Sequence, residues 1–95
     1  VIASSESGPS KIGISRDPKK RLKQLQTGHS APLQIFHVQE VPEQRTRLLE
    51  RIIHKTLRHV CVSGEWFNLP VTDAIAEVTY AMMRYEDTPN LRDYV

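Results

Sequence analysis

Apolar and polar residues alternate in two stretches of the chain, as in strands that bury one face, and residues 1–3 form a short apolar strand fragment. Residues 1–3 and 11–15 flank the polar stretch SSESGP, which has turn-forming composition, so they are predicted to pair as a β-hairpin. In the second of these strands, Ile12 and Ile14 are predicted to share one face. Residues 33–41 alternate again and predict a third strand with mixed burial.

Other stretches repeat apolar residues at helical spacing. The first predicted helix, residues 18–26, follows Asp17, whose carboxylate can accept backbone N–H groups, and begins with Pro18, which suits the first helical position. Gly28 is predicted to end it in a left-handed cap. The second predicted helix covers residues 42–59, and its apolar stripe consists of Leu48, Leu49, Ile52, Ile53 and Leu57.

The third predicted helix covers residues 73–85, with Thr72 as its cap. Its apolar stripe is Ile75, Val78, Met82 and Tyr85, with Ala74 and Ala81 alongside. Residues 60–68 are predicted to be an irregular or short extended connection, and residues 88–95 a polar tail. The order strand, strand, helix, strand, helix, helix fits a small α+β layer. Because a chain of 95 residues has room for one hydrophobic core, residues 1–87 are expected to form a single domain.

Positive charge is concentrated in one stretch, although the net charge of the chain is only +2. The cations of this stretch are Lys11, Arg16, Lys19, Lys20, Arg21 and Lys23. Acidic residues predominate from Asp73 onward. A basic face of this kind indicates an anionic partner, for which the DNA backbone is the natural candidate.

The cysteine content and the lengths of the apolar runs indicate the cellular compartment in which the protein is expected. Cys61 is the sole cysteine, so an internal disulfide is excluded and the reducing cytoplasm is the expected location. No apolar run reaches membrane-spanning length and no signal-peptide pattern occurs, so no membrane role is expected. A zinc site built from His54, His59 and Cys61 is rejected, because the spacing matches no zinc-finger pattern and a fourth ligand is lacking.

Several short motifs occur in an order that resembles the GIY-YIG nuclease superfamily. Lys11-Ile12-Gly13, with Arg21 on the next predicted helix, is similar to the second half of the GIY-YIG signature, in the phage and bacterial branch where that tripeptide reads Lys-Ile-Gly. LKQLQTG at 22–28 and Gly64-Glu65-Trp66-Phe67 resemble the same branch, and the similarity runs from residue 1 to about residue 68. The resemblance implies a small three-stranded antiparallel sheet flanked by three helices, and a metal-dependent endonuclease that hydrolyses DNA.

Two residues are the main candidates for hydrolysis. Arg21 carries a planar fork of donors that can grip two phosphate oxygens, and the resemblance places the catalytic arginine here. The resemblance also places one divalent ion, Mg²⁺ or Mn²⁺, on Glu50. His54 follows four residues later on the same helical face, where it could orient the carboxylate, contact phosphate or transfer a proton. The alternative is an ordinary surface pair of Glu50 with His54 or Thr46.

Further candidates surround these two. Lys11 stands where most of the superfamily has a second catalytic tyrosine, and it is expected to bind phosphate or to assist a base. Gly13 permits close backbone approach. Glu65 is a candidate second carboxylate and Asn68 a candidate support for it, whereas Trp66-Phe67 is predicted to be core. The residues expected to follow the DNA backbone without reading bases are Arg16, Lys19, Lys20, Lys23 and His29.

The resemblance also implies a tyrosine that acts as the general base or holds it. This tyrosine would fall immediately before Val1, so the N-terminal strand is expected to be truncated, and water to be activated by the tyrosine or by Lys11. Two other functions remain open: a non-catalytic DNA-binding module of the same fold, and a protein-interaction domain whose basic helix meets an acidic partner. Target choice is expected to come from a homodimer or from a fused targeting domain.

Overall fold

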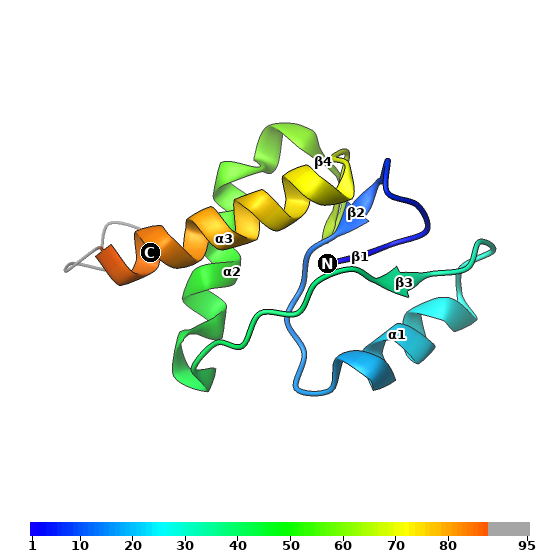
Figure 1. Ribbon diagram of the computed structural model, residues 1–95, viewed down its shortest axis with the longest axis horizontal. Coiled ribbons are helices and arrows are strands. Elements are labelled where there is room, and N and C mark those ends of the chain that lie inside the picture. Colours follow the sequence, from blue (N-terminus) through cyan, green and yellow to red (C-terminus); the bar gives the residue numbers. More distant parts are fainter. Residues whose placement is uncertain (88–95) are drawn as a thin grey trace.

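A computed structural model of the chain describes residues 1–87 (Figure 1), so the tail predicted at 88–95 lies outside the described residues. The strands are β1 (Ile2–Ala3), β2 (Ser10–Lys11), β3 (Gln34–Ile35), β4 (Cys61–Ser63) and β5 (Trp66–Phe67). The helices are α1 (Pro18–Thr27), α2 (Thr46–Thr56) and α3 (Val71–Asp87). Two 3-10 turns, Glu43–Arg45 and Arg58–Val60, precede and follow α2. The α+β class predicted from the sequence is confirmed.

The sheet has five strands in the order β3-β1-β2-β5-β4, and every neighbouring pair is antiparallel. The predicted hairpin is confirmed, with Ile2 opposite Lys11. The prediction of three strands was wrong, because residues 60–68 contribute a second hairpin, β4–β5. β5 is the strand that joins this hairpin to β2, through the pair Lys11 and Trp66. Such long-range pairing leaves no signal in the local apolar pattern.

The predicted strands 11–15 and 33–41 are mostly irregular. β2 ends at Lys11, and the two isoleucines that follow do not share an environment: Ile12 is 5% exposed and Ile14 44%. β3 contains only Gln34–Ile35. The segments 12–17 and 36–42 therefore lead as irregular chain from the sheet to α1 and to the turn before α2 (Figure 1).

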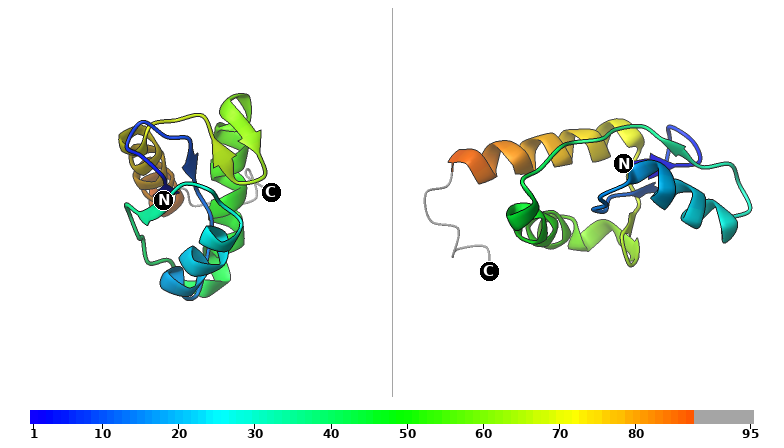
Figure 2. Two further views of the ribbon diagram at one scale, coloured as in Figure 1. Left: turned by 90° about the vertical axis from the view of Figure 1, so that its right-hand side faces the viewer. Right: turned by 90° about the horizontal axis from the view of Figure 1, so that it is seen from below.

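α1 begins as predicted and ends differently. The Asp17 carboxylate accepts a hydrogen bond from Lys20 N at 3.1 Å, and Pro18 is the first helical residue. Gly28 has φ −99°, so the predicted left-handed cap was wrong. α1 has no fully buried residue and lies beside β3, away from α2 and α3 (Figures 1 and 2). Its polar faces are consequently open to solvent.

The core lies where α2 and α3 cross, beside the sheet (Figures 1 and 2). Four residues of the predicted α2 stripe are buried: Leu49, Ile52, Ile53 and Leu57. Phe67 of β5 is fully buried against them. α3 begins at Val71, so Thr72 lies inside the helix instead of capping it. The buried residues of α3 are Val71, Ala74, Val78 and Ala81, so the face that carries the two alanines, and not the centre of the predicted stripe, lies against the core. The side chain of Tyr85 lies outside the described part.

Candidate active site

A cleft of about 1050 Å³ opens between the sheet, α1 and the start of α2. Its walls include the irregular segments 12–16 and 37–41. The acidic, basic and histidine residues of its lining are Lys11, Arg16, Arg21, His37, Glu40, Glu43, Arg47, Glu50, His54 and Glu65. Residues far apart in the sequence, Arg21 and Glu50 among them, therefore line one cleft.

The two cations predicted to act on phosphate line this cleft without an anionic protein partner. Arg21 is half-buried, and within residues 1–87 its guanidinium forms no hydrogen bond or ion pair. Lys11 is only 9% exposed, and the ring of Trp66 is the contact made by its ammonium, with Nζ 5.5 Å from the ring centroid. A buried cation ordinarily has a carboxylate partner. Their arrangement leaves both groups available to an external anion.

Glu50 and His54 face each other in the cleft from consecutive turns of α2. His54 Nε2 lies 3.7 Å from Glu50 Oε1, and the two side chains are 32% and 30% exposed. Within residues 1–87 this Nε2 atom is buried without a hydrogen-bond partner, and the imidazole and the ring of Phe67 form a T-shaped pair at 5.3 Å between centroids. The pair predicted as a surface alternative is thus present, but it lies in the cleft with half-buried side chains.

The acidic and histidine side chains of the cleft determine which kind of metal ion can bind there. Among the described residues, no three acidic, histidine or cysteine side chains come together as a metal-binding group. A cage of protein ligands such as Zn²⁺ needs is therefore absent from residues 1–87. Mg²⁺ commonly uses one or two carboxylates and keeps several waters, so Glu50 fits as its single protein ligand.

The structure places one further histidine in the cleft that the sequence analysis missed. His37 lines the cleft, and its Nε2 atom is buried without a hydrogen-bond partner within residues 1–87. Its carbonyl oxygen accepts a hydrogen bond from Val1 N at 2.8 Å. His37 lay in the predicted strand 33–41 among apolar residues, so no motif marked it.

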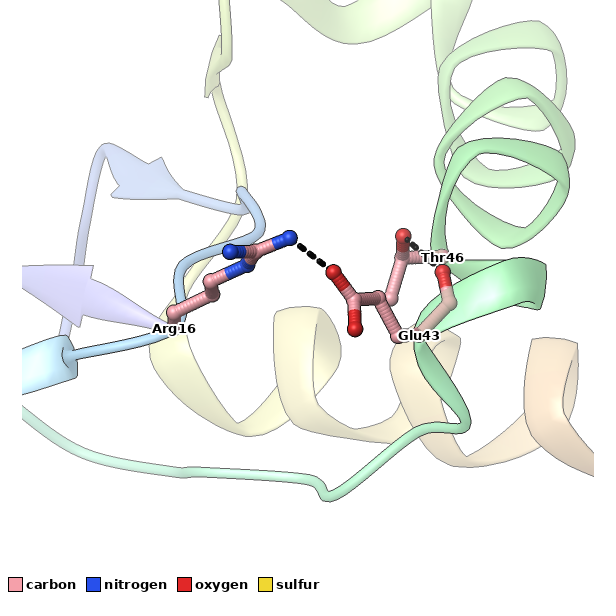
Figure 3. A network of polar contacts seen from close by, with 3 residues as sticks. All are labelled: Arg16, Glu43 and Thr46. Carbon is pink, nitrogen blue, oxygen red and sulfur yellow. Dashed lines mark hydrogen bonds and ion pairs between the residues drawn. The ribbon is translucent and has the colours of Figure 1, made fainter.

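Arg16 is not free, although it was predicted to follow the DNA backbone. Its guanidinium forms an ion pair with the carboxylate of Glu43 across the cleft, and Thr46 Oγ1 donates to Glu43 O at 2.9 Å (Figure 3). The side chains of Arg16 and Glu43 are 90% and 71% exposed. Solvent screens such a pair, so it contributes little to stability, and a phosphate can displace the Glu43 carboxylate.

Replacing Glu43 by glutamine is expected to tighten DNA binding by about 2–5-fold at low salt, the range of an exposed ion pair, because it releases Arg16. Fluorescence anisotropy with a labelled duplex measures the change. Glu40→Gln is the matched control, since Glu40 lies on the same cleft but does not pair with Arg16. Equal gains in both variants would show that general charge, and not the release of Arg16, is responsible.

The remaining predicted residues lie outside the cleft lining. The lysines Lys19, Lys20 and Lys23 are exposed on α1. The His29 ring stacks on Trp66 at 5.7 Å between centroids. Trp66 is half-buried at the surface and not in the core, where it was predicted to lie. Asn68 is exposed, and its backbone N–H donates to Val60 O at 2.8 Å. The structure does not bring the Asn68 side chain to Glu65.

Comparison with known proteins identifies one family. The T5orf172 domain matches residues 1–82, which is most of the chain. No curated protein and no solved structure matches the chain. Within the described residues, no helix combines the length and the apolar character needed to cross a bilayer. The chain therefore belongs to the T5orf172 domain family, a phage-associated and nuclease-related group.

Proposed function

We propose that this domain is a metal-dependent DNA endonuclease of the GIY-YIG kind, which hydrolyses phosphodiester bonds by in-line attack of water. The observation that supports it best is the meeting of Arg21, Lys11 and Glu50 at one cleft. Two cations that have no anionic partner among residues 1–87 and one half-buried carboxylate are groups that phosphodiester hydrolysis requires. Membership of a nuclease-related family is consistent with this chemistry.

The cleft cations act on the phosphate. The Arg21 guanidinium grips two phosphate oxygens and offsets the negative charge that grows as the phosphorus becomes pentacovalent. Lys11 adds a second positive charge from β2, with its position set by the Trp66 ring. Because neither side chain has to break an ion pair with a carboxylate before it contacts phosphate, the site is organised before DNA binds.

Glu50 holds the metal ion, one Mg²⁺ or Mn²⁺. When bound, such an ion supplies positive charge to the phosphate and lowers the pKa of coordinated water. His54 keeps the Glu50 carboxylate directed into the cleft from the next turn of α2. Phe67 restrains the imidazole of His54, so the core positions this pair.

DNA reaches the cleft along α1. The exposed lysines of α1 lie next to Arg21 on one helix, where they can contact successive phosphates without reading bases. A domain of this size has little surface for sequence recognition, so a second copy or a fused domain selects the target.

The free, exposed Cys61 suits the reducing cytoplasm.

Replacing Lys19, Lys20 and Lys23 together by glutamine is expected to weaken DNA binding by about 10–100-fold at low salt, and to reduce the salt slope by about one for each phosphate that is no longer neutralised. Binding isotherms at several salt concentrations measure both quantities. The matched control replaces three exposed cations of the α2 region that lie outside the cleft, Arg51, Lys55 and Arg58. A larger loss of affinity in the control would place the DNA on α2 instead.

A second candidate is DNA binding without cleavage. It is favoured by the position of the α1 lysines outside the cleft, since they can bind a duplex whether or not the cleft is active. A plasmid-nicking assay with Mg²⁺ or Mn²⁺ distinguishes the two functions. Nicking that requires the metal supports the endonuclease, and salt-sensitive binding without nicking supports the binding module. Indifference to nucleic acid would instead leave a protein-interaction domain.

A further inference from the structure

Glu65 is held in a defined place by the turn between β4 and β5. Gly64, at the tip of this turn, has φ 55°, in the left-handed region where glycine carries no steric penalty. The carbonyl oxygen of Glu65 then accepts a hydrogen bond from Ile12 N at 3.0 Å. This bond fixes the backbone of Glu65 beside the segment 12–16, which forms one wall of the cleft.

The Glu65 carboxylate occupies the space that a side chain at position 13 would need. A Cβ atom built on Gly13 would lie 1.9 Å from Glu65 Oε2 and 3.1 Å from Glu65 Cδ. The backbone of Gly13 does not require glycine, because its φ is not positive. Glycine is needed here because it lets the carboxylate lie directly against the cleft wall.

The same carboxylate has unused capacity to accept hydrogen bonds. Within residues 1–87 its oxygens accept none and form no ion pair, although Glu65 lines the cleft together with Arg21 and Glu50. A half-buried carboxylate usually finds a donor in its own protein. Its free oxygens are therefore available to a water molecule in the cleft.

The other candidate for activating water within this chain is less suited to accept a proton. Lys11 Nζ lies over the Trp66 ring, and the negative face of an aromatic ring attracts the charged ammonium. An ammonium group has no lone pair with which to take a proton. Lys11 therefore fits the binding of phosphate better than the activation of water.

We propose that Glu65, positioned by Gly13, is the general base that takes the proton of the attacking water. The water oxygen bonds to phosphorus while the bond from phosphorus to the leaving oxygen breaks. The water proton passes to a carboxylate oxygen of Glu65, which later releases it to solvent, and the leaving oxygen is protonated by solvent. This assignment rests on the endonuclease function proposed above, and it adds a catalytic residue to that site.

Glu65→Ala is expected to lower kcat for plasmid nicking by about 10²–10³-fold, the usual contribution of general-base catalysis, with DNA affinity changed less than about 2-fold. Added formate or acetate is expected to restore activity, because a small carboxylate can occupy the vacated space and accept the proton. The same salts added to Arg21→Ala serve as the control and should restore nothing, since an anion cannot replace a guanidinium. A merely structural role for Glu65 gives no rescue.

Gly13→Ala tests the positioning step separately. The added methyl group meets the flexible end of the Glu65 side chain, so the carboxylate is displaced while the fold is kept. We expect kcat to fall by about 10–100-fold, as for a displacement of about 1 Å, with an unchanged Tm. Gly28→Ala is the matched control, because a Cβ there meets nothing within 4 Å and φ is −99°. Adding Gly13→Ala to Glu65→Ala should cause no further loss of activity.

The outcomes separate this inference from the function on which it rests. A wild-type protein that never nicks DNA overturns both. A wild-type protein that nicks DNA, with Glu65→Ala equally active, overturns the role of Glu65 alone. Loss of activity that is restored by more Mg²⁺ and not by formate or acetate also overturns it, because Glu65 would then be a metal ligand.

Discussion

Replacing Arg21 by alanine is expected to lower kcat for DNA cleavage by about 10³-fold, with a change in the dissociation constant for DNA of less than about 5-fold. Arg21 is one cation among several that attract DNA, so the loss of its charge matters little to binding. In the transition state, by contrast, the loss of this guanidinium removes the bidentate contact with phosphate from α1, whose other cations are lysines outside the cleft lining. Single-turnover nicking rates at saturating protein measure kcat without interference from binding.

Two variants make this result specific. Arg21→Lys keeps the charge but loses the bidentate geometry, so it should recover only part of the activity. Arg51→Ala removes an exposed arginine of α2 that does not line the cleft, and it should nick DNA at the wild-type rate. If Arg21→Ala weakened binding as much as it slowed cleavage, Arg21 would be a DNA contact without a special role in the transition state.

Replacing Glu50 by glutamine is expected to reduce cleavage by at least about 10³-fold and to abolish the response to Mg²⁺ or Mn²⁺. Glutamine keeps the shape of the side chain but removes the charge that a hard divalent cation requires. DNA binding in the absence of metal should persist, since the α1 lysines lie elsewhere. Nicking rates titrated against Mn²⁺ give the first measurement.

Metal binding can be followed without DNA as well. Mn²⁺ bound at Glu50 should broaden the NMR resonances of the His54 ring, which lies 3.7 Å from the carboxylate, and Glu50→Gln should remove this effect. Glu6→Gln is a suitable control, because Glu6 is exposed in the turn between β1 and β2. Cleavage and Mn²⁺ broadening that both survive in Glu50→Gln would remove Glu50 from the metal site.

Local sequence accounts for the parts of the fold that depend on neighbouring residues. Asp17-Pro18 begins α1 because capping and a preset φ act within one helical turn. The apolar spacing of α2 identified most of its buried face, because a helix with one broad apolar stripe can bury only that side. The centre of the α3 stripe was less well predicted: Ala74 and Ala81, expected beside the stripe, are buried, because small residues let the two crossing helices approach closely.

The candidate site also contains residues that the sequence identified and contacts that only the structure revealed. Motif resemblance singled out Arg21, Glu50, Lys11 and Gly13 without any knowledge of their distances, and all of them line the cleft. The ion pair that occupies Arg16 could not be foreseen, because Glu43 reaches it only through the path of the irregular chain after β3. His37 entered the cleft for the same reason.

The sequence by itself determined the α+β class, the start of α1 at its local cap and the basic character of α1, and it named the candidates for acting on phosphate. These properties follow from interactions within a few residues or from side-chain chemistry alone. Only the tertiary structure decided that β5 joins β2, that the Glu65 carboxylate lies against Gly13, and that Arg16 is paired. Each of these depends on contacts between distant segments, which arise when the core around Phe67 closes and which local periodicity does not encode.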